Sequence, residues 1–207
     1  MALSRRCLML GAIGAVSSLS GCVGGSFRTY YAAAIPPEAS RGWRVTDVAV
    51  TVPPTLVVSE ALTLLPTADI VWREDPPGDR YAQVAAIMTE AARQGASGLR
   101  GSRPVRLSLT MTRFHALTFE AETRLSNSGV HNIDFVAQVT DARTGAVLAG
   151  PEVIEAALPA LSGDQMRAAR ARGETQKSQI TAHVRATIAG WLGAGPDIRG
   201  EFSRNGN

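Results

Sequence analysis

Residues 105–112 spell Val-Arg-Leu-Ser-Leu-Thr-Met-Thr, and this stretch decides the fold. Apolar and polar side chains alternate along it without a break, and a two-residue period is typical of a β-strand that buries one face. Such strands are common in antiparallel sheets, whose second face lies toward solvent. The alternation shifts at Arg113-Phe114, where we expect a bulge or a bend. The stretch therefore predicts a sheet with one covered and one solvated face.

Further strands are expected on both sides of this stretch. Residues 44–52 and 132–140 alternate in the same way, and residues 68–73 form a shorter strand. Asp-Ala-Arg-Thr-Gly at 141–145 has the composition of a hairpin loop, so a returning strand is expected to begin directly after it. Residues 119–125 are expected to continue as strand or as loop. About five strands result.

Two segments have the period of amphipathic helices. Asp79 is suited to cap the first helix, which is predicted to run to Gln94 and to end at Gly95. Ser162-x-x-Gln165 resembles a capping box, so the second helix is predicted from there to about Leu192, with a weak point at Gly173. Its apolar stripe consists of Ile180, Val184, Thr187, Ile188 and Trp191. Trp191 is thus predicted to be a packing residue and the neighbouring His183 to be peripheral.

The order of these elements predicts the fold class. We expect an α+β fold, a two-layer sandwich in which a mainly antiparallel sheet of about five strands packs against two helices. This domain is predicted to span residues 42–193. Residues 194–207 begin with Gly-Ala-Gly-Pro and are predicted to form a flexible tail.

The N-terminal segment has the features of an export signal. Arg5 and Arg6 precede an apolar run that ends in Leu19-Ser20-Gly21-Cys22, and this order is typical of a secretory signal peptide. The run holds about a dozen residues, fewer than the roughly 20 that a membrane-spanning helix needs. The tetrapeptide resembles the lipobox of bacterial lipoproteins. That resemblance implies cleavage after residues 1–21, a thioether-linked diacylglycerol on Cys22, and acylation, typically with palmitate, of the new amino terminus.

The same segment bears on the route and the destination of export. Ser4-Arg5-Arg6-Cys7-Leu8 resembles a twin-arginine signal, but two arginines also suit any export signal, so the route stays open. Val23 stands where an inner-membrane retention signal would have aspartate. By resemblance to the sorting rule of lipoproteins, this favours the outer membrane, with the domain facing the periplasm. Residues 22–41, rich in Gly, Ser and Pro, are predicted to be a lipidated tether, unless Phe27 and Tyr30 pack onto the domain.

Composition excludes several classes of function. Cleavage removes Arg5 and Arg6 but no acidic residue, so 21 basic residues fall to 19 against 18 acidic ones, and the net charge falls from +3 to +1. This balance predicts no nucleic-acid partner. Cys7 leaves with the signal and Cys22 is lipidated, so no thiol remains for catalysis, a disulfide or a metal.

The remaining reactive side chains lack the spacing of a known site. The histidines have no metal-ligand spacing, and the chain holds no phosphate-binding loop. The acidic residues are predicted to be surface charges and helix caps. A pair of carboxylates that cleaves glycan is defined by the distance between them in the fold, so the sequence leaves that alternative open. The arginines predict a solvated helix face, with contact to anionic lipid as the alternative. These residues are His115, His131, His183, Asp69, Glu74, Asp75, Asp79, Glu120, Glu122, Arg167, Arg170 and Arg172. We expect no catalytic residue, no cofactor and no metal, and Cys22 as the modified site.

Two longer motifs carry a family resemblance. Val-Pro-Pro-Thr-Leu-Val-Val-Ser-Glu (52–60) and Ala-Asp-Ile-Val-Trp-Arg-Glu-Asp-Pro (68–76), followed by Gly-Asp-Arg (78–80), resemble an uncharacterised family of bacterial lipoproteins known only as a domain of unknown function. The plan of the chain is also similar to that of auxiliary envelope lipoproteins of transport systems. The resemblance implies a place in the cell envelope and no particular activity.

Together these observations predict a non-catalytic lipoprotein, an accessory or binding module. Its expected partners are the membrane, through the lipid anchor, and an envelope protein. One alternative is a transport auxiliary or a carrier of lipid or lipopolysaccharide, which would need a wide apolar groove between sheet and helices. The other is a periplasmic enzyme acting on glycan, which would need a buried pair of carboxylates in a cleft.

Overall fold

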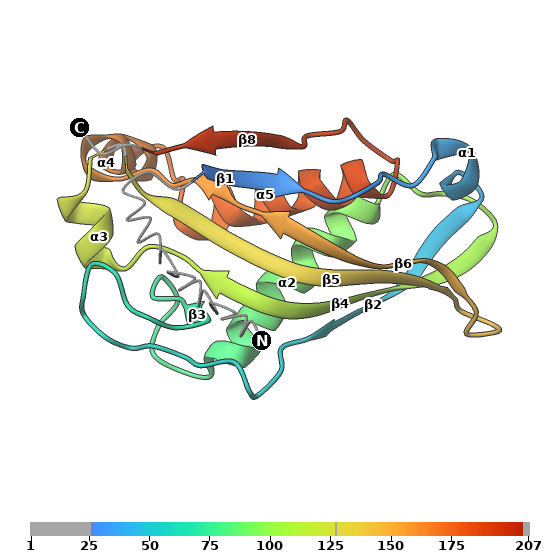
Figure 1. Ribbon diagram of the computed structural model, residues 1–207, viewed down its shortest axis with the longest axis horizontal. Helices are drawn as coiled ribbons and strands as arrows, with labels where there is room; N and C mark the ends of the chain where they lie inside the picture. Colours follow the sequence, from blue (N-terminus) through green and yellow to red (C-terminus); the bar gives the residue numbers. More distant parts are fainter. Residues whose placement is uncertain (1–25, 127, 205–207) are drawn as a thin grey trace, which may run out of the picture.

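The strand predicted at 105–112 belongs to a mixed, mostly antiparallel sheet, in which it lies second from one edge (Figure 1). The structure is a computed structural model that describes residues 26–126 and 128–204. Its elements are, in chain order, β1 (Ser26–Tyr30), α1 (Pro37–Ser40), β2 (Trp43–Thr51), β3 (Ile70–Val71), α2 (Arg80–Ala96), β4 (Arg103–His115), α3 (Phe119–Arg124), β5 (Val130–Asp141), β6 (Val147–Ala156), β7 (Leu158–Pro159), α4 (Gly163–Ala171), α5 (Gln176–Trp191) and β8 (Gly200–Ser203).

Six strands follow one another in the order β2-β4-β5-β6-β1-β8, and the short strands β3 and β7 pair with β4 and β5. β4 runs parallel to β2 and β3, and every other pairing is antiparallel. The register of β4 against β5 shifts between Met111 and Arg113, which confirms the expected irregularity. The predicted α+β fold is therefore confirmed, with more strands than the expected five.

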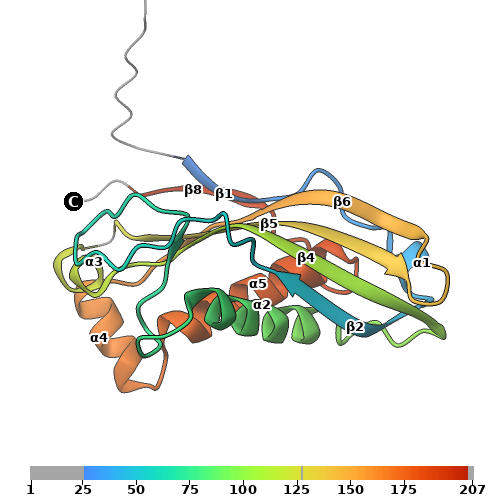
Figure 2. The ribbon, with the colours of Figure 1, turned by 90° about the horizontal axis from the view of Figure 1, so that it is seen from below.

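The helices α2 and α5 pack side by side against one face of the sheet (Figure 2). Asp79 caps α2 as predicted, because its Oδ1 accepts a hydrogen bond from the backbone N–H of Ala82 at 3.0 Å. Gly95 lets the two helices approach closely. A Cβ at this position would lie 2.7 Å from the carbonyl oxygen of Arg185 in α5, so a larger residue would force the helices apart.

The single long helix predicted from residue 162 is wrong in one respect. The chain forms two helices, α4 and α5, because Gly173 adopts a φ of +82° that other residues disfavour. Ser162 makes no side-chain capping bond, and the capping box lies instead at Thr175 and Ser178, at the start of α5. The predicted apolar stripe is correct, and Trp191 is 1% exposed.

The segment 119–125 is neither strand nor loop. Thr118 accepts a hydrogen bond on Oγ1 from the backbone N–H of Ala121 at 3.1 Å and so caps the short helix α3. A Thr at this position is a favoured N-cap residue, and this signal competes with the short alternation that the segment also shows.

Both ends of the described chain belong to the sheet. Ser26–Tyr30, expected within the tether 22–41, forms β1 between β6 and β8, and Tyr31 is fully buried. The Tyr31 hydroxyl donates to Asp197 Oδ1 at 2.8 Å. The expected flexible tail, 194–207, likewise contributes β8. Period-based reasoning missed both strands because each is short and gains its stability from pairing with the other. The signal peptide and Cys22 lie outside the described residues.

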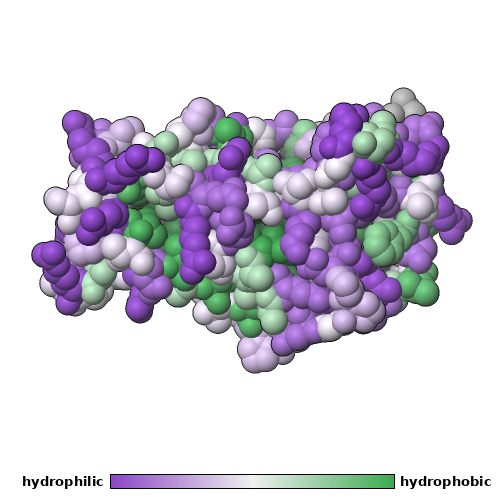
Figure 3. Space-filling model, turned by 180° about the vertical axis from the view of Figure 1, so that it is seen from behind, coloured by the Kyte–Doolittle hydropathy of each residue, from purple (hydrophilic) through white to green (hydrophobic). Residues whose placement is uncertain are grey.

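The side of the molecule that carries the helices is mixed in character. Figure 3 shows polar residues around apolar patches on this face. Among the residues that the structure describes, no helix is both long and apolar enough to span a membrane.

We predict that Trp191→Ala lowers the free energy of unfolding by about 3–5 kcal/mol, because it removes a buried indole between α5 and the sheet. Denaturant unfolding followed by circular dichroism measures this loss. Val153→Ala is the control, since Val153 is 61% exposed and its truncation should change stability by no more than about 0.5 kcal/mol. Equal losses in the two variants would contradict the packing role of Trp191.

Candidate functional site

The sheet face opposite α2 and α5 is the candidate site, and we call it the open face (Figures 1 and 2). Residues on β4, β5, β6 and β1 alternate between the buried core and this face. Polar and charged side chains dominate the open face. The polar and charged residues used below are Arg28, Tyr30, Arg113, His115, Asn132, Asp134 and Glu155, and the apolar Val153 lies on the same face.

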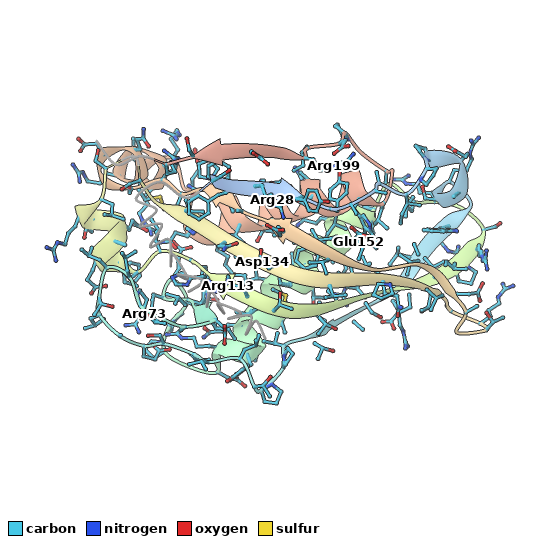
Figure 4. All side chains as sticks on the ribbon, viewed as in Figure 1. Arg28, Arg73, Arg113, Asp134, Glu152 and Arg199 are labelled. Atoms are coloured by element: carbon cyan, nitrogen blue, oxygen red, sulfur yellow. The ribbon has the colours of Figure 1, made fainter. Side chains whose placement is uncertain are left out.

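A row of four charged side chains crosses the open face from β4 to β1. Arg113 is the register partner of Asp134, and Asp134 is in turn the partner of Glu155. Arg28 in β1 donates to Glu155 from Nε at 2.9 Å and from Nη2 at 2.5 Å. Its guanidinium also lies 4.2 Å from the ring centroid of Tyr30. Figure 4 shows Arg28, Arg113 and Asp134 on adjacent parts of this face. We call these four side chains the charged row.

Asp134 is the unusual member of the charged row. Its Oδ1 is buried without a hydrogen-bond partner, and its Oδ2 lies 3.9 Å from Arg113 Nε, too far for a hydrogen bond. Burial, reinforced by the negative charge of Glu155, raises the pKa of Asp134 to about 6, although Arg113 acts in the opposite direction. A carboxyl group that titrates near neutral pH can bind or release a proton on contact with a ligand.

An apolar cavity of about 220 Å³ adjoins the charged row at one end of the sheet. Arg113, His115 and Asn132 form its polar side, and burial lowers the pKa of His115, which favours the neutral imidazole. The apolar lining comes from β1, β5, the segment before β3 and the loops around α3, and consists of Phe27, Leu64, Leu65, Ala116, Leu117, Leu125 and Val130. A pocket with one apolar wall and a few polar groups suits a small apolar or amphipathic group.

The three histidines lie closer together than their positions in the sequence indicate. His131 is fully buried, and neither ring nitrogen has a hydrogen-bond partner. Burial, with smaller contributions from His115 and His183, lowers its pKa to about 3. The prediction that His183 is peripheral is wrong, because its Nε2 lies 2.9 Å from Thr29 Oγ1 and burial lowers its pKa. Across residues 26–126 and 128–204, no three or more His, Cys, Asp and Glu side chains form a group that could hold a metal ion.

Two acidic residues from separate segments meet at the start of α5. Arg170 bridges them, with Nη1 at 2.9 Å from Glu74 Oε1 and Nη2 at 2.8 Å from Glu122 Oε2. Glu74 also accepts the backbone N–H groups of Gln176 at 3.2 Å and Lys177 at 2.6 Å. Acidic groups stabilise a helix N-terminus, so these carboxylates cap and anchor α5. Glu122 lies on helix α3, in the segment expected to be strand or loop.

The other acidic residues predicted to be caps or surface charges also have local partners. Asp69 accepts the backbone N–H of Val57 at 2.8 Å. Asp75 accepts the indole N–H of Trp72 at 2.9 Å and the ammonium group of Lys177 at 2.7 Å. Of the remaining arginines, Arg167 pairs with Asp164 and Arg172 pairs with Glu174, and both pairs lie at the surface. The solvated helix face predicted for the three arginines is confirmed for Arg167 and Arg172 and is wrong for Arg170, which bridges the largely buried Glu74 and Glu122.

The charged row is what sequence reasoning missed. Its members occupy the solvent-facing positions of alternating strands. A charged residue is ordinary at such a position and does not by itself indicate a site. Only the cross-strand register, including the shift at Arg113, places them in one line. Asp134 and Glu155 lie at similar distances on either side of the predicted hairpin loop at 141–145. Residues placed in this way lie opposite each other on the two strands, and this signal could have paired them.

Comparisons with known proteins identify a family and a few similar structures. The model of a family described as "Family of unknown function (DUF6778)" matches residues 43–207. Among curated proteins, none matches the chain.

Two of the similar solved structures come from different bacteria. The PelC dodecamer from Paraburkholderia phytofirmans is 14% identical, with a TM-score of 0.36 over 82% of this chain and 98% of that one. A "putative lipoprotein" from Caulobacter crescentus CB15 is also 14% identical, with a TM-score of 0.35 over 75% of this chain and 93% of that one.

We predict that Asp134→Asn stabilises the protein at pH 7.5 by on the order of 1–3 kcal/mol and not at pH 4. The pKa of Asp134 is raised in the folded state, so its contribution to stability is present at low pH and is lost as the pH rises through about 6. Asparagine removes the charge that is unfavourable above that pH. Thermal melts at the two pH values measure the effect.

Asp47→Asn is the matched control for this prediction, because Asp47 is a half-exposed strand residue paired with Arg106. Its substitution should be neutral or slightly destabilising. A gain for Asp134→Asn that is the same at both pH values would contradict the assignment.

Proposed function

The chain belongs to the family of unknown function DUF6778, and we propose that this member is a lipid-anchored protein of the bacterial cell envelope that acts as a non-catalytic accessory or binding module. The observation that carries the proposal is Leu19-Ser20-Gly21-Cys22, placed at the end of an export signal. Only three residues separate Cys22 from Ser26, where β1 begins. A lipid on Cys22 and two further acyl chains hold a protein stably on a membrane. Val23 favours the outer membrane as the site of anchoring.

The open face is the surface that we propose for binding. It presents the charged row beside exposed apolar side chains, with Val153 61% and Tyr30 39% exposed. A mixture of apolar area, an aromatic ring and paired charges is common at protein interfaces that form and dissociate. Besides the membrane, the proposed partner of the module is therefore an envelope protein that covers the open face.

The packing of the core favours a binding module over a lipid carrier. A carrier needs a wide apolar groove between the two layers, but Trp72, Phe135 and Trp191 lie fully buried there in one continuous core. The apolar cavity beside the charged row lies at the end of the sheet and measures only about 220 Å³.

The arrangement of the carboxylates favours a binding module over an enzyme that acts on glycan. Glu74 and Glu122 are a close and largely buried pair, as such an enzyme requires. Both carboxylates are occupied by Arg170, and Glu74 also accepts two backbone N–H groups of α5. Their hydrogen-bonding capacity serves the fold, which leaves little for proton transfer to a substrate.

We predict that Cys22→Ala abolishes lipidation and leaves an uncleaved precursor, because no other cysteine follows the export signal. Mass spectrometry of the protein extracted from membranes measures the modification. Cys7→Ala is the matched control and should be processed as wild type. A mature wild-type protein that retains an unmodified Met1 would contradict the proposed cleavage and lipidation.

We also predict that a photo-crosslinking amino acid in place of Val153 captures an envelope protein in intact cells. The same amino acid in place of Arg185, which is exposed on α5 on the other side of the molecule, is the control. The crosslinked species should be specific to position 153 and should weaken when Arg28→Glu reverses one end of the charged row. Identical products from positions 153 and 185 would argue against the open face as the binding surface.

A further inference from the structure

One end of the molecule exposes large apolar side chains. Leu62 is 68% exposed, Leu65 82% and Phe119 44%, and the two leucines are the most exposed large apolar residues of the described chain. Leu62 and Leu65 belong to the long connection between β2 and β3, and Phe119 is the first residue of α3. Exposed leucines are common singly, but a group of them beside an apolar cavity marks an interaction surface.

Local contacts hold these residues at the same end of the sheet. The connection is fastened to α3, because Thr118 Oγ1 donates to the carbonyl oxygen of Thr63 at 2.9 Å. Leu64 packs against the small buried cluster that contains Leu117, whereas Leu62 and Leu65 are largely exposed. Leu65 lines the same cavity as Phe27, the second residue of β1. We call Leu62, Leu65 and Phe119 the apolar tip.

The start of the described chain lies beside the apolar tip. Three residues separate Cys22 from Ser26. Four steps of a fully extended chain span at most roughly 14 Å. A membrane that holds a lipid on Cys22 must therefore lie within this distance of the start of β1. It must also lie close to the cavity that Leu65 lines.

We propose that the apolar tip inserts into the interfacial region of the bilayer that holds the Cys22 lipid, so that the domain sits on the membrane by this end. The inference rests on the proposed lipid anchor. Leucine and phenylalanine side chains favour the boundary between headgroups and acyl chains, and a short link to the anchor brings them there. The hairpin between β5 and β6 lies at the opposite end of the sheet and would point away from the membrane (Figure 1).

Depth-dependent quenching tests this orientation. The mature lipidated protein has no free thiol, so Leu65→Cys allows one site to be labelled with an environment-sensitive fluorophore. The control is Ala146→Cys, which is exposed in the β5–β6 hairpin. Both proteins are reconstituted into vesicles of phosphatidylethanolamine and phosphatidylglycerol that contain a lipid spin-labelled near the headgroup, and flotation of the vesicles measures anchoring.

The expected result is that both proteins float with the vesicles and that the fluorophore at position 65 is quenched several-fold more than the one at position 146. The double variant Leu62→Glu and Phe119→Glu should still float but should lose the excess quenching at position 65. Flotation with equal quenching at both positions would overturn the inference alone. An apolar spectrum at position 65 without lipid quenching would indicate contact with a second copy and would overturn it too. A wild-type protein that does not float would overturn the inference together with the proposed anchor.

Discussion

The close packing of α2 against α5 on a single face of the sheet is the constraint on which the rest of the structure depends. At Gly95 the backbone of one helix nearly touches the backbone of the other, which leaves no room for a side chain. Because the pair packs on one face, most of the inward residues of β4 and β5 are apolar, and the alternate residues are free to be polar. The open face with its charged row is a consequence of that division.

Polar residues fix the position at which each of these two helices begins. Asp79 caps α2, and Glu74, Glu122 and Arg170 hold the start of α5. The structure thus assigns its most concentrated carboxylates to helix ends. Buried polar atoms without a hydrogen-bond partner include Asp134 Oδ1 on the open face and both ring nitrogens of His131 in the core. Of these two residues, only Asp134 is placed where a partner could reach it.

The long elements could be predicted from the sequence because each carries its own period. The alternation at 105–112 and at 132–140, and the apolar stripe that ends at Trp191, depend on local burial alone. Prediction failed where pairing between distant segments decides the structure, at β1 and β8, and where a cap outweighed a short alternation, at α3. The charged row was missed because its members come from four strands. The sequence of one strand does not determine its register against the other three.

The pairing of β1 with β8 joins the two ends of the described chain, with Ser26 opposite Ser203. Contacts between residues so far apart in the sequence cost loop-closure entropy, which slows folding. During synthesis β1 emerges first, yet one of its edges must wait for nearly the whole chain before β8 can cover it. Until then β1 presents a free strand edge, which is prone to pair with other chains. A chain truncated before Gly200 would keep that edge open permanently and would be liable to associate edge to edge.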